Sequence, residues 1–215
     1  MYRTLRTVSL LALAAGFAAA GALAAAEPAS PIKRLGKTVV QHKDERVRAV
    51  LSWRFANQTF EKEPWILLEL AFSAEGSTVD LNREDVSLLT PGGERIPLPG
   101  QKRLAEGLKD VRWFIQRSSV ARDPLTGYFS RPTYQQRLPF FAIPGEQVVL
   151  DEIGGGPSML TIGDLFFESP AGAWKPGKYI LVLKNKTIDV ELPFSFPADE
   201  PAKETKEKDP KAVTW

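Results

Sequence analysis

Apolar and polar residues alternate along several stretches of this chain, and the alternation predicts β-strands. In residues 47–55 every second side chain is apolar, which gives a strand one buried face and one solvated face. Residues 65–74 are apolar almost throughout, and the core-facing positions are expected to be Ile66, Leu68, Leu70 and Phe72. Further strands are expected at residues 86–89, 95–98, 138–143, 147–151, 160–168, 178–184 and 187–194.

Two connections between the expected strands have the composition of tight turns. Thr90–Glu94 places a proline and two glycines between apolar runs, which predicts a hairpin. Asn185 lies at the centre of residues 183–187 and predicts a second hairpin, because asparagine tolerates turn conformations. Gly154–Gly156 lacks the lysine and hydroxyl residue of a phosphate-binding loop, so we expect a flexible connection there.

The hydrophobic period changes between residues 101 and 119. Leu104, Leu108, Val111 and Ile115 recur at spacings that place them on one face of a helix. We therefore predict one inserted helix over about 101–119, packed on an edge or end of the sheets. Many short strands with turn signals and one helix predict a mostly β fold, an antiparallel β-sandwich.

The first 26 residues have the charge and hydropathy order of a secretory signal peptide. Arg3 and Arg6 precede an apolar run, which ends in Ala-x-Ala sites at residues 22–24 and 24–26. The alternative is a retained membrane anchor, since residues 8–26 are nearly long enough to span a bilayer. Cleavage predicts a periplasmic or extracellular protein with no further membrane span.

Composition divides the remainder into a linker, a domain and a tail. Residues 27–36 are expected to form a linker, 37–197 the sandwich domain, and 198–215 a disordered charged tail. Removing residues 1–26 leaves a formally neutral chain, so the charge gives no reason to expect nucleic-acid binding. The absence of cysteine excludes disulfides, thiolate metal sites and cysteine nucleophiles.

A short motif near the C-terminal strands carries a resemblance. The pattern Trp174-x-Pro176-Gly177-x-Tyr179-x-Leu181 resembles one found in immunoglobulin-like sandwich modules of secreted bacterial proteins. Residues 117–193 are also similar to uncharacterised secreted bacterial proteins. The resemblance implies an immunoglobulin-like sandwich without the usual cysteine pair, and it implies no active site. We expect Trp174, Gly177 and Tyr179 to be structural, with Gly177 at a positive φ.

The sequence offers no clear catalytic or metal constellation. A triad or a two-histidine metal site would need His42, the only histidine, which we expect in an exposed loop. Asp80–Asp85 resembles the start of a calcium loop, but Asp85 replaces the glycine and Pro91 the bidentate glutamate that such loops need. We therefore expect a solvated turn there, and assign no catalytic, cofactor or metal residues.

A local excess of positive charge marks residues 101–137. This segment holds eight lysines and arginines against three acids, with aromatic residues among them. Arginine fits carboxylates and phosphates with two parallel hydrogen bonds, so an anionic ligand or partner surface is one interpretation. Ordinary solvated charge around an inserted helix is the other. The candidate partner-binding residues are Arg117, Arg122, Tyr128, Arg131 and Tyr134.

Three classes of function stay open at this point. The first is a non-enzymatic binding or assembly module whose partner is an envelope protein or an anionic ligand. The second is a carboxylate-based hydrolase of the envelope or of glycans, which requires two acids within roughly 10 Å of each other in a concave site. The third is a structural envelope protein.

Export predicts a specific N-terminus for the mature protein. Cleavage after Ala26 leaves Glu27 as the first residue, because the last Ala-x-Ala site ends there. Mass spectrometry of the N-terminal peptide from the envelope fraction measures it. An intact Met1 on membrane-bound protein would contradict cleavage.

Overall fold

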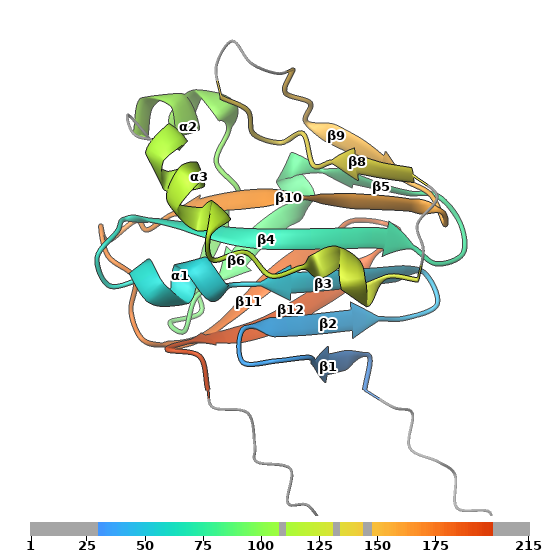
Figure 1. Cartoon of the computed structure of the whole chain (residues 1–215), viewed down its shortest axis with the longest axis horizontal. Coiled ribbons are helices and arrows are strands. Elements are labelled where there is room, and N and C mark those ends of the chain that lie inside the picture. Colours follow the sequence, from blue (N-terminus) through green and yellow to red (C-terminus); the bar gives the residue numbers. More distant parts are fainter. Residues whose placement is uncertain (1–29, 108–110, 131–133, 144–147, 200–215) are drawn as a thin grey trace, which may run out of the picture.

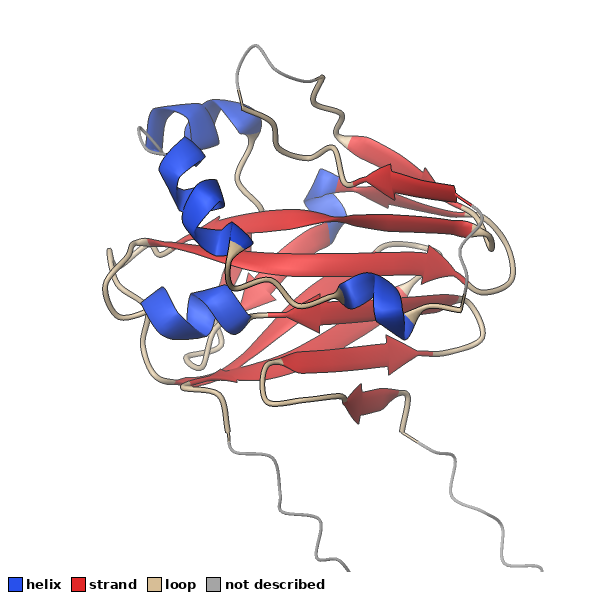
Figure 2. Ribbon diagram, in the orientation of Figure 1, coloured by secondary structure: helices blue, strands red, loops and turns tan. Residues whose placement is uncertain are grey.

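The computed structural model describes residues 30–199, apart from 108–110, 131–133 and 144–147. The expected signal peptide and residues 200–215 of the expected tail lie outside this range. The described chain is mostly β, as predicted, with one six-stranded, one four-stranded and one two-stranded sheet (Figures 1 and 2). None of its described helices is long and apolar enough to cross a membrane.

The six-stranded sheet has the order β1-β2-β3-β4-β10-β8. Its strands are β1 (Ile32–Arg34), β2 (Val39–Lys43), β3 (Val47–Ser52), β4 (Trp65–Ala74), β8 (Tyr134–Arg137) and β10 (Met159–Glu168). Neighbouring strands are antiparallel except β8 and β10, which are parallel. The expectation of a wholly antiparallel sheet is wrong at this pair. The long connection from β8 to β10 supplies the crossover that parallel neighbours need.

The four-stranded sheet has the order β12-β11-β6-β7 and contains both predicted hairpins. Its strands are β6 (Val86–Leu89), β7 (Arg95–Pro97), β11 (Gly177–Lys184) and β12 (Asp189–Phe196). The turn between β6 and β7 has Gly93 at φ 82°, a conformation that favours glycine. Strands β5 (Val79–Asn82) and β9 (Glu152–Gly155) form the two-stranded sheet beside the larger ones (Figure 1).

The main core lies between the two larger sheets. The predicted inward residues of β4, Ile66, Leu68, Leu70 and Phe72, are all buried there. Side chains of β6, β11 and β12 complete the same cluster from the other sheet. The opposite face of β4 is also buried, because helical segments cover it. This central strand is therefore enclosed on both sides.

The single inserted helix predicted over 101–119 is wrong in two respects. The segment forms two helices, α2 (Gln101–Gly107) and α3 (Val111–Ser119), and it covers the outer face of the six-stranded sheet rather than an edge (Figure 1). Phe114 of α3 packs on Phe55 and Phe166, with ring centroids 5.0 and 6.2 Å away. A short 3-10 helix, η2 (Leu125–Tyr128), follows on the same face.

The strand predicted over residues 47–55 is too long. Strand β3 ends at Ser52, and α1 (Arg54–Thr59) follows. Trp53, Ala56 and Phe60 are buried and lie three and four residues apart, which is a helical period. Phe60 stacks on Phe196 with a centroid separation of 4.8 Å. The predicted strand ran past Ser52 because Trp53 and Phe55 continue the alternating apolar pattern of the strand although they belong to the helical turn.

The glycine run expected to be a flexible connection is partly a strand. Gly154 and Gly155 belong to β9, which pairs with β5. A Cβ atom at Gly155 would lie 2.8 Å from the Phe72 ring, so only glycine allows this strand to approach the core so closely. The strands expected at 138–143 and in the described part of 147–151 are absent, so those predictions are also wrong.

Tyr179 fixes the corner where the chain enters β11. Its side chain is buried, and its hydroxyl donates to the Lys175 carbonyl at 2.7 Å and accepts from the Lys175 N–H at 3.2 Å. Gly177 has the predicted positive φ, at 144°, and a Cβ atom there would lie 2.7 Å from Pro91. Trp174 and Tyr179 are buried and Gly177 lies in close contact with Pro91, as expected for residues that support the fold.

Substitutions of Tyr179 separate its ring from its hydroxyl. Tyr179→Ala should lower the free energy of unfolding by about 3–5 kcal/mol, because a large buried ring is lost. Tyr179→Phe should cost only about 1 kcal/mol, the usual contribution of a hydrogen bond. Urea denaturation measures both, with Tyr134→Ala on the exposed face of β8 as the control. Equal losses for Tyr179→Ala and the control would refute a core role.

Candidate functional site

The residues predicted to bind a partner lie on several different elements. Arg117 on α3 pairs with Glu63 at 3.4 Å, and its guanidinium lies over the Trp113 ring at 4.2 Å. Tyr128 ends η2 and is half-buried, while Tyr134 on β8 is exposed. Arg131 lies outside the described residues. Arg122 is engaged by carboxylates of its own chain, so the positive excess counted along the segment is partly neutralised by distant acids.

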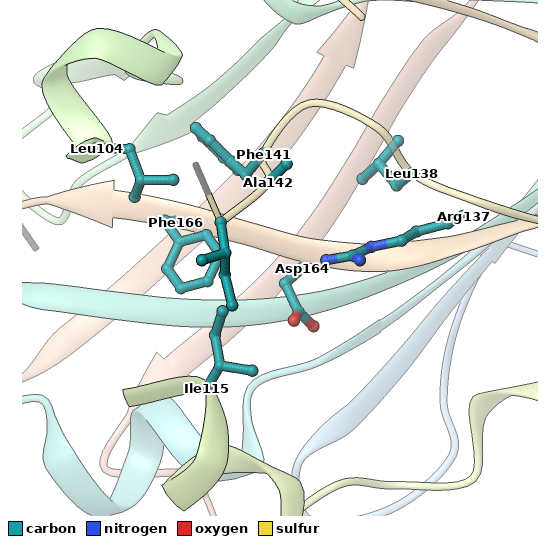
Figure 3. Close-up of a pocket in the computed structure, with 9 residues that line it drawn as sticks. Leu104, Ile115, Arg137, Leu138, Phe141, Ala142, Asp164 and Phe166 are labelled. Carbon is teal, nitrogen blue, oxygen red and sulfur yellow. The ribbon is translucent and has the colours of Figure 1, made fainter. Parts of the chain in front are cut away.

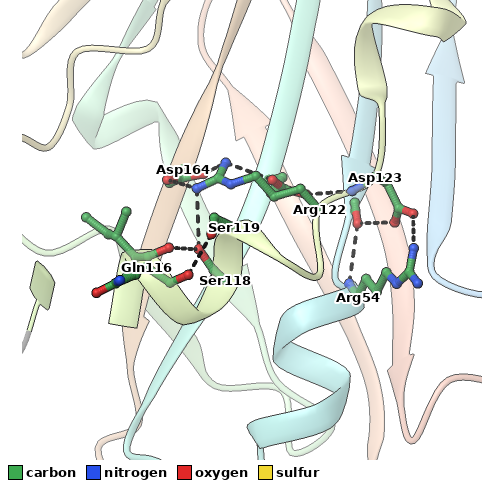
Figure 4. A network of polar contacts seen from close by, with 10 residues as sticks. Arg54, Gln116, Ser118, Ser119, Arg122, Asp123 and Asp164 are labelled. Atoms are coloured by element: carbon green, nitrogen blue, oxygen red, sulfur yellow. Dashed lines mark hydrogen bonds and ion pairs between the residues drawn. The ribbon is translucent and has the colours of Figure 1, made fainter. Parts of the chain in front are cut away.

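Those acids face each other across two strands. Glu69 of β4 and Asp164 of β10 are direct partners in the antiparallel register, so their side chains lie on the same outer face. Arg122, in the loop between α3 and η2, donates hydrogen bonds to both of them, and Figure 4 shows its guanidinium beside Asp164. One nitrogen, Nη1, donates to Glu69 Oε1 and to Asp164 Oδ1, each at 2.8 Å. The two carboxylate oxygens are therefore separated by no more than twice that distance.

Asp123 extends the same network to β3 and α1 (Figure 4). Its carboxylate accepts from Ser52 Oγ at 2.6 Å and from Arg54 Nη1 at 3.2 Å. Its backbone N–H donates to Glu69 Oε2 at 3.3 Å. We call Glu69, Arg122, Asp123 and Asp164 the carboxylate cluster. Through these contacts the α3–η2 loop is joined to four elements of the domain, β3, β4, β10 and α1.

Burial changes the acidity of one member of the carboxylate cluster. Desolvation raises the pKa of Glu69 from 4.5 to about 7; Arg122 opposes this rise, and the negative charges of Asp164 and Asp123 add to it. The hydrogen bond to Asp164 raises the pKa of Arg122, which therefore stays charged. Near neutral pH, Glu69 is present in both its protonated and its ionised form.

A small cavity adjoins the carboxylate cluster (Figure 3). Its volume is about 10 Å³, and Asp164, Leu104, Ile115 and Phe166 contribute to its lining. The guanidinium of Arg137 turns toward Asp164 at one side (Figure 3). This volume corresponds to about one water molecule. Among the described residues, this cavity beside Asp164 is therefore too small for a substrate.

Two other sequence candidates are accounted for by local contacts. The expectation that His42 lies in an exposed loop is wrong, since it is a buried residue of β2 whose Nε2 lies 3.2 Å from Asp44 Oδ2. In the suspected calcium loop, Asp85 Oδ2 accepts from the Asn82 N–H at 2.8 Å and from Asn185 Nδ2 at 3.1 Å. Across the described residues, no group of three or more histidines and acids is placed to hold a metal ion.

A larger groove lies where the β6–β7 turn meets the loop from β10 to β11. Its volume is about 380 Å³, and its lining consists of three prolines, several apolar side chains and the polar or charged residues Thr90, Glu94, Ser169 and Lys175. The lining residues used below are Pro91, Gly92, Ala173, Trp174 and Tyr179. Sequence reasoning assigned the motif at 174–181 a structural role only. The contact of Pro91 with Gly177, which brings the two loops together, is invisible in one sequence.

The aromatic wall of this groove is held by internal hydrogen bonds. Trp174 Nε1 donates to the Pro64 carbonyl at 3.0 Å, and the Tyr179 hydroxyl is bound to Lys175. The two rings pack edge to face, with centroids 5.9 Å apart. Satisfied polar atoms and mutual packing fix these side chains. The groove is therefore formed before any ligand binds.

Comparison with known proteins gives no family to which these features can be assigned. No family model matches the chain, and neither a curated protein nor a solved structure shows significant similarity to it.

Arg122 should contribute more to stability than Arg103, because the acids that it pairs with are largely buried. Arg122→Ala leaves the largely buried Glu69 and Asp164 side chains without their shared cation, and should cost roughly 2–4 kcal/mol at neutral pH. Arg103→Ala breaks the more exposed pair with Glu168 and should cost about 0–1 kcal/mol. Chemical denaturation of both variants makes the comparison. Equal costs would mean that the carboxylate cluster is no more than a surface ion pair.

Proposed function

We propose that this chain is an exported, non-enzymatic binding module built on an immunoglobulin-like sandwich. The order β12-β11-β6-β7 corresponds to strands G-F-C-C′ of such a sandwich, and the order β3-β4-β10 corresponds to A-B-E. Tyr179 occupies the position of the tyrosine corner, near the start of F with its hydroxyl bound to backbone upstream. The fold assignment rests on these correspondences.

The chain departs from that architecture at its edges. Strands β1 and β2 extend the sheet beyond the A position, and β8 runs parallel to β10 where strand D would be antiparallel. The helices of residues 101–119 occupy the outer face of that sheet. Loops and insertions around a common scaffold are where related sandwiches differ in function.

The observation that carries the binding proposal is the preformed groove at the end of the four-stranded sheet. Its volume of about 380 Å³ falls within the range of ligand sites, and its lining combines apolar side chains with fixed aromatic rings. Three prolines and an aromatic wall suit a short apolar segment of a partner protein. The two charged residues of the lining, Glu94 and Lys175, are exposed to solvent, so we favour recognition by shape and apolar contact.

The anionic partner considered for residues 101–137 has less support than the groove. Arg117 and Arg122 are each paired with acids of the same chain, and part of their charge is thereby neutralised. An envelope protein remains the proposed class of partner, because the proposed export places the module among such proteins.

A second candidate, a carboxylate-based hydrolase, is favoured by one specific observation. Glu69 and Asp164 are close enough for the separation of about 5–5.5 Å found in retaining glycosidases, and the pKa of Glu69 suits a general acid. Arg122 donates hydrogen bonds to both of them, and the adjoining cavity holds about 10 Å³. A hydrolase would therefore require the covering segment to move, and we rank this function second.

Site-specific cross-linking tests the groove as the binding site. A photoreactive amino acid at Ala173, an exposed position of the lining, should form one defined adduct in envelope extracts of the source cell. Gly92→Trp should reduce that adduct at least tenfold, because a Cβ atom there has space and the ring fills the groove. Gly100→Trp, at an equally open glycine outside the groove, is the matched control.

The outcomes separate the candidate functions. Loss of the adduct with Gly92→Trp but not with Gly100→Trp supports the binding module. The binding module would be contradicted if the wild type, Gly92→Trp and Gly100→Trp gave equal adduct yields, or if the wild type gave no adduct. Hydrolysis of envelope glycan by the wild type that disappears in Asp164→Asn would favour the hydrolase instead.

A further inference from the structure

The four-stranded sheet brings the end of the described chain close to the groove. Phe196, the last residue of β12, is the register partner of Gly177, the first residue of β11. Gly177 in turn lies against Pro91, which lines the groove. Asp199, the last described residue, follows Phe196 three positions later. The chain beyond residue 199 therefore starts from the end of the sheet where the groove lies.

The point of departure of this following segment is fixed by polar contacts. The carboxylate of Asp199 pairs with Arg34 at 3.2 Å and accepts from Ser195 Oγ at 2.9 Å. In the strand order β12-β11-β6-β7, three spacings of about 4.8 Å separate β12 from β7, so the far side of the groove is about 15 Å away across the sheet. A chain of about thirteen residues, the length of 200–212, spans up to about 43 Å when extended. Residue 213 and those after it are therefore within reach of the groove.

The sequence after Asp199 is charged first and apolar only near residue 215. Val213 and Trp215 are the first branched aliphatic and the first aromatic residue after Phe196. They are two positions apart, so in an extended segment their side chains point to the same side. Residues 200–212 are thus a spacer rich in lysine and acids, and it leads to one short apolar face.

We propose that residues 213–215 occupy the groove of their own chain, with Trp215 against its prolines and aromatic wall, and that a partner must displace them. This inference rests on the proposed function of the groove and adds a regulation of that site. The groove volume of about 380 Å³ lies within the range of ligand sites. The lining offers a Trp side chain three prolines, Pro91, Pro170 and Pro176, together with Ala173.

The charges at the groove match those of the segment that precedes Trp215. Glu94 and Lys175 are the charged residues of the lining, and both are exposed. Asp209 and Lys211 lie a few residues before Trp215, and each has a partner of opposite sign in the lining. The wall itself makes no polar demand on a ligand, because its indole and phenol groups bond to the chain's own backbone. Apolar contact with two flanking ion pairs is therefore the chemistry that this segment supplies.

Tethering makes even weak contact effective. A ligand joined to its site by a short linker is present at an effective concentration in the millimolar range. Residues 213–215 therefore occupy the groove part of the time without high affinity, and they shield its apolar lining when no partner is present. A partner that binds the groove competes with this internal segment, which sets a threshold for binding.

Cross-linking within the purified full chain tests this occupation. A photoreactive amino acid at Ala173 should give an adduct with the segment that follows Lys211, identified by mass spectrometry of the digested protein. The experiment uses an equal mixture of unlabelled and ¹⁵N-labelled chains at low concentration. Occupation by the chain's own segment gives adducts of a single label, whereas occupation by a second copy gives adducts of mixed label.

Trp215→Ser should lower the yield of the intrachain adduct at least tenfold, because the ring supplies most of the apolar contact. Lys206→Ser, in the charged spacer, is the matched control and should leave the yield unchanged. Gly92→Trp fills the groove and should also abolish the adduct, whereas Gly100→Trp should not. In envelope extracts, Trp215→Ser should raise the adduct of Ala173 with the partner about two- to tenfold, because the competitor is lost.

Self-occupation is overturned if the wild type forms no intrachain adduct, if Trp215→Ser keeps it, or if the adducts join different chains. Loss of the adduct in Lys206→Ser, or an unchanged partner adduct in Trp215→Ser, would also overturn it. A partner adduct without the intrachain adduct would leave the binding module in place. An intrachain adduct without any partner adduct would support self-occupation and contradict the binding module, so the two failures are distinguishable.

Discussion

The ion pairs of Arg122 with Glu69 and Asp164 are the constraint on which the outer half of this structure depends. All ten residues of β4 are buried, so its outer face must be covered, yet that face carries Glu69. A carboxyl group enclosed in this way needs hydrogen-bond donors, since burying a charge without partners is costly. Arg122 and the Asp123 N–H supply them from one loop, and so the loop, α3 and η2 are fixed where they cover the sheet.

The inner half follows a different physical logic. The two larger sheets enclose an almost wholly apolar core, and the corner at Tyr179 joins them through a satisfied hydroxyl. Close approach of backbone completes this half, with Gly155 against Phe72 and Gly177 against Pro91. The same corner forms the wall of the groove, so the contacts that stabilise the inner half of the domain also shape the proposed binding site.

The sequence predicted what depends on local pattern and missed what depends on distant partners. The inward face of β4 and both hairpins were predictable, because period and turn chemistry are local. The end of β3 was not predictable, because Trp53 fits both the alternating pattern of the strand and the helical spacing of the buried residues around α1. The charge excess in 101–137 was real, but its partners Glu63, Glu69, Asp164 and Glu168 lie on other elements. The groove was missed for the same reason.

The account of the outer face rests on the ionisation of one side chain, and NMR titration of the Glu69 side-chain carboxyl carbon measures it directly. The burial and the opposing acids predict a midpoint near pH 7, and a lower midpoint in Asp164→Asn. A midpoint near 4.5 in the wild type, the ordinary value for a solvated glutamate, would contradict the account. It would mean that Arg122 fully compensates the burial and that the cluster does not respond to protons near neutral pH.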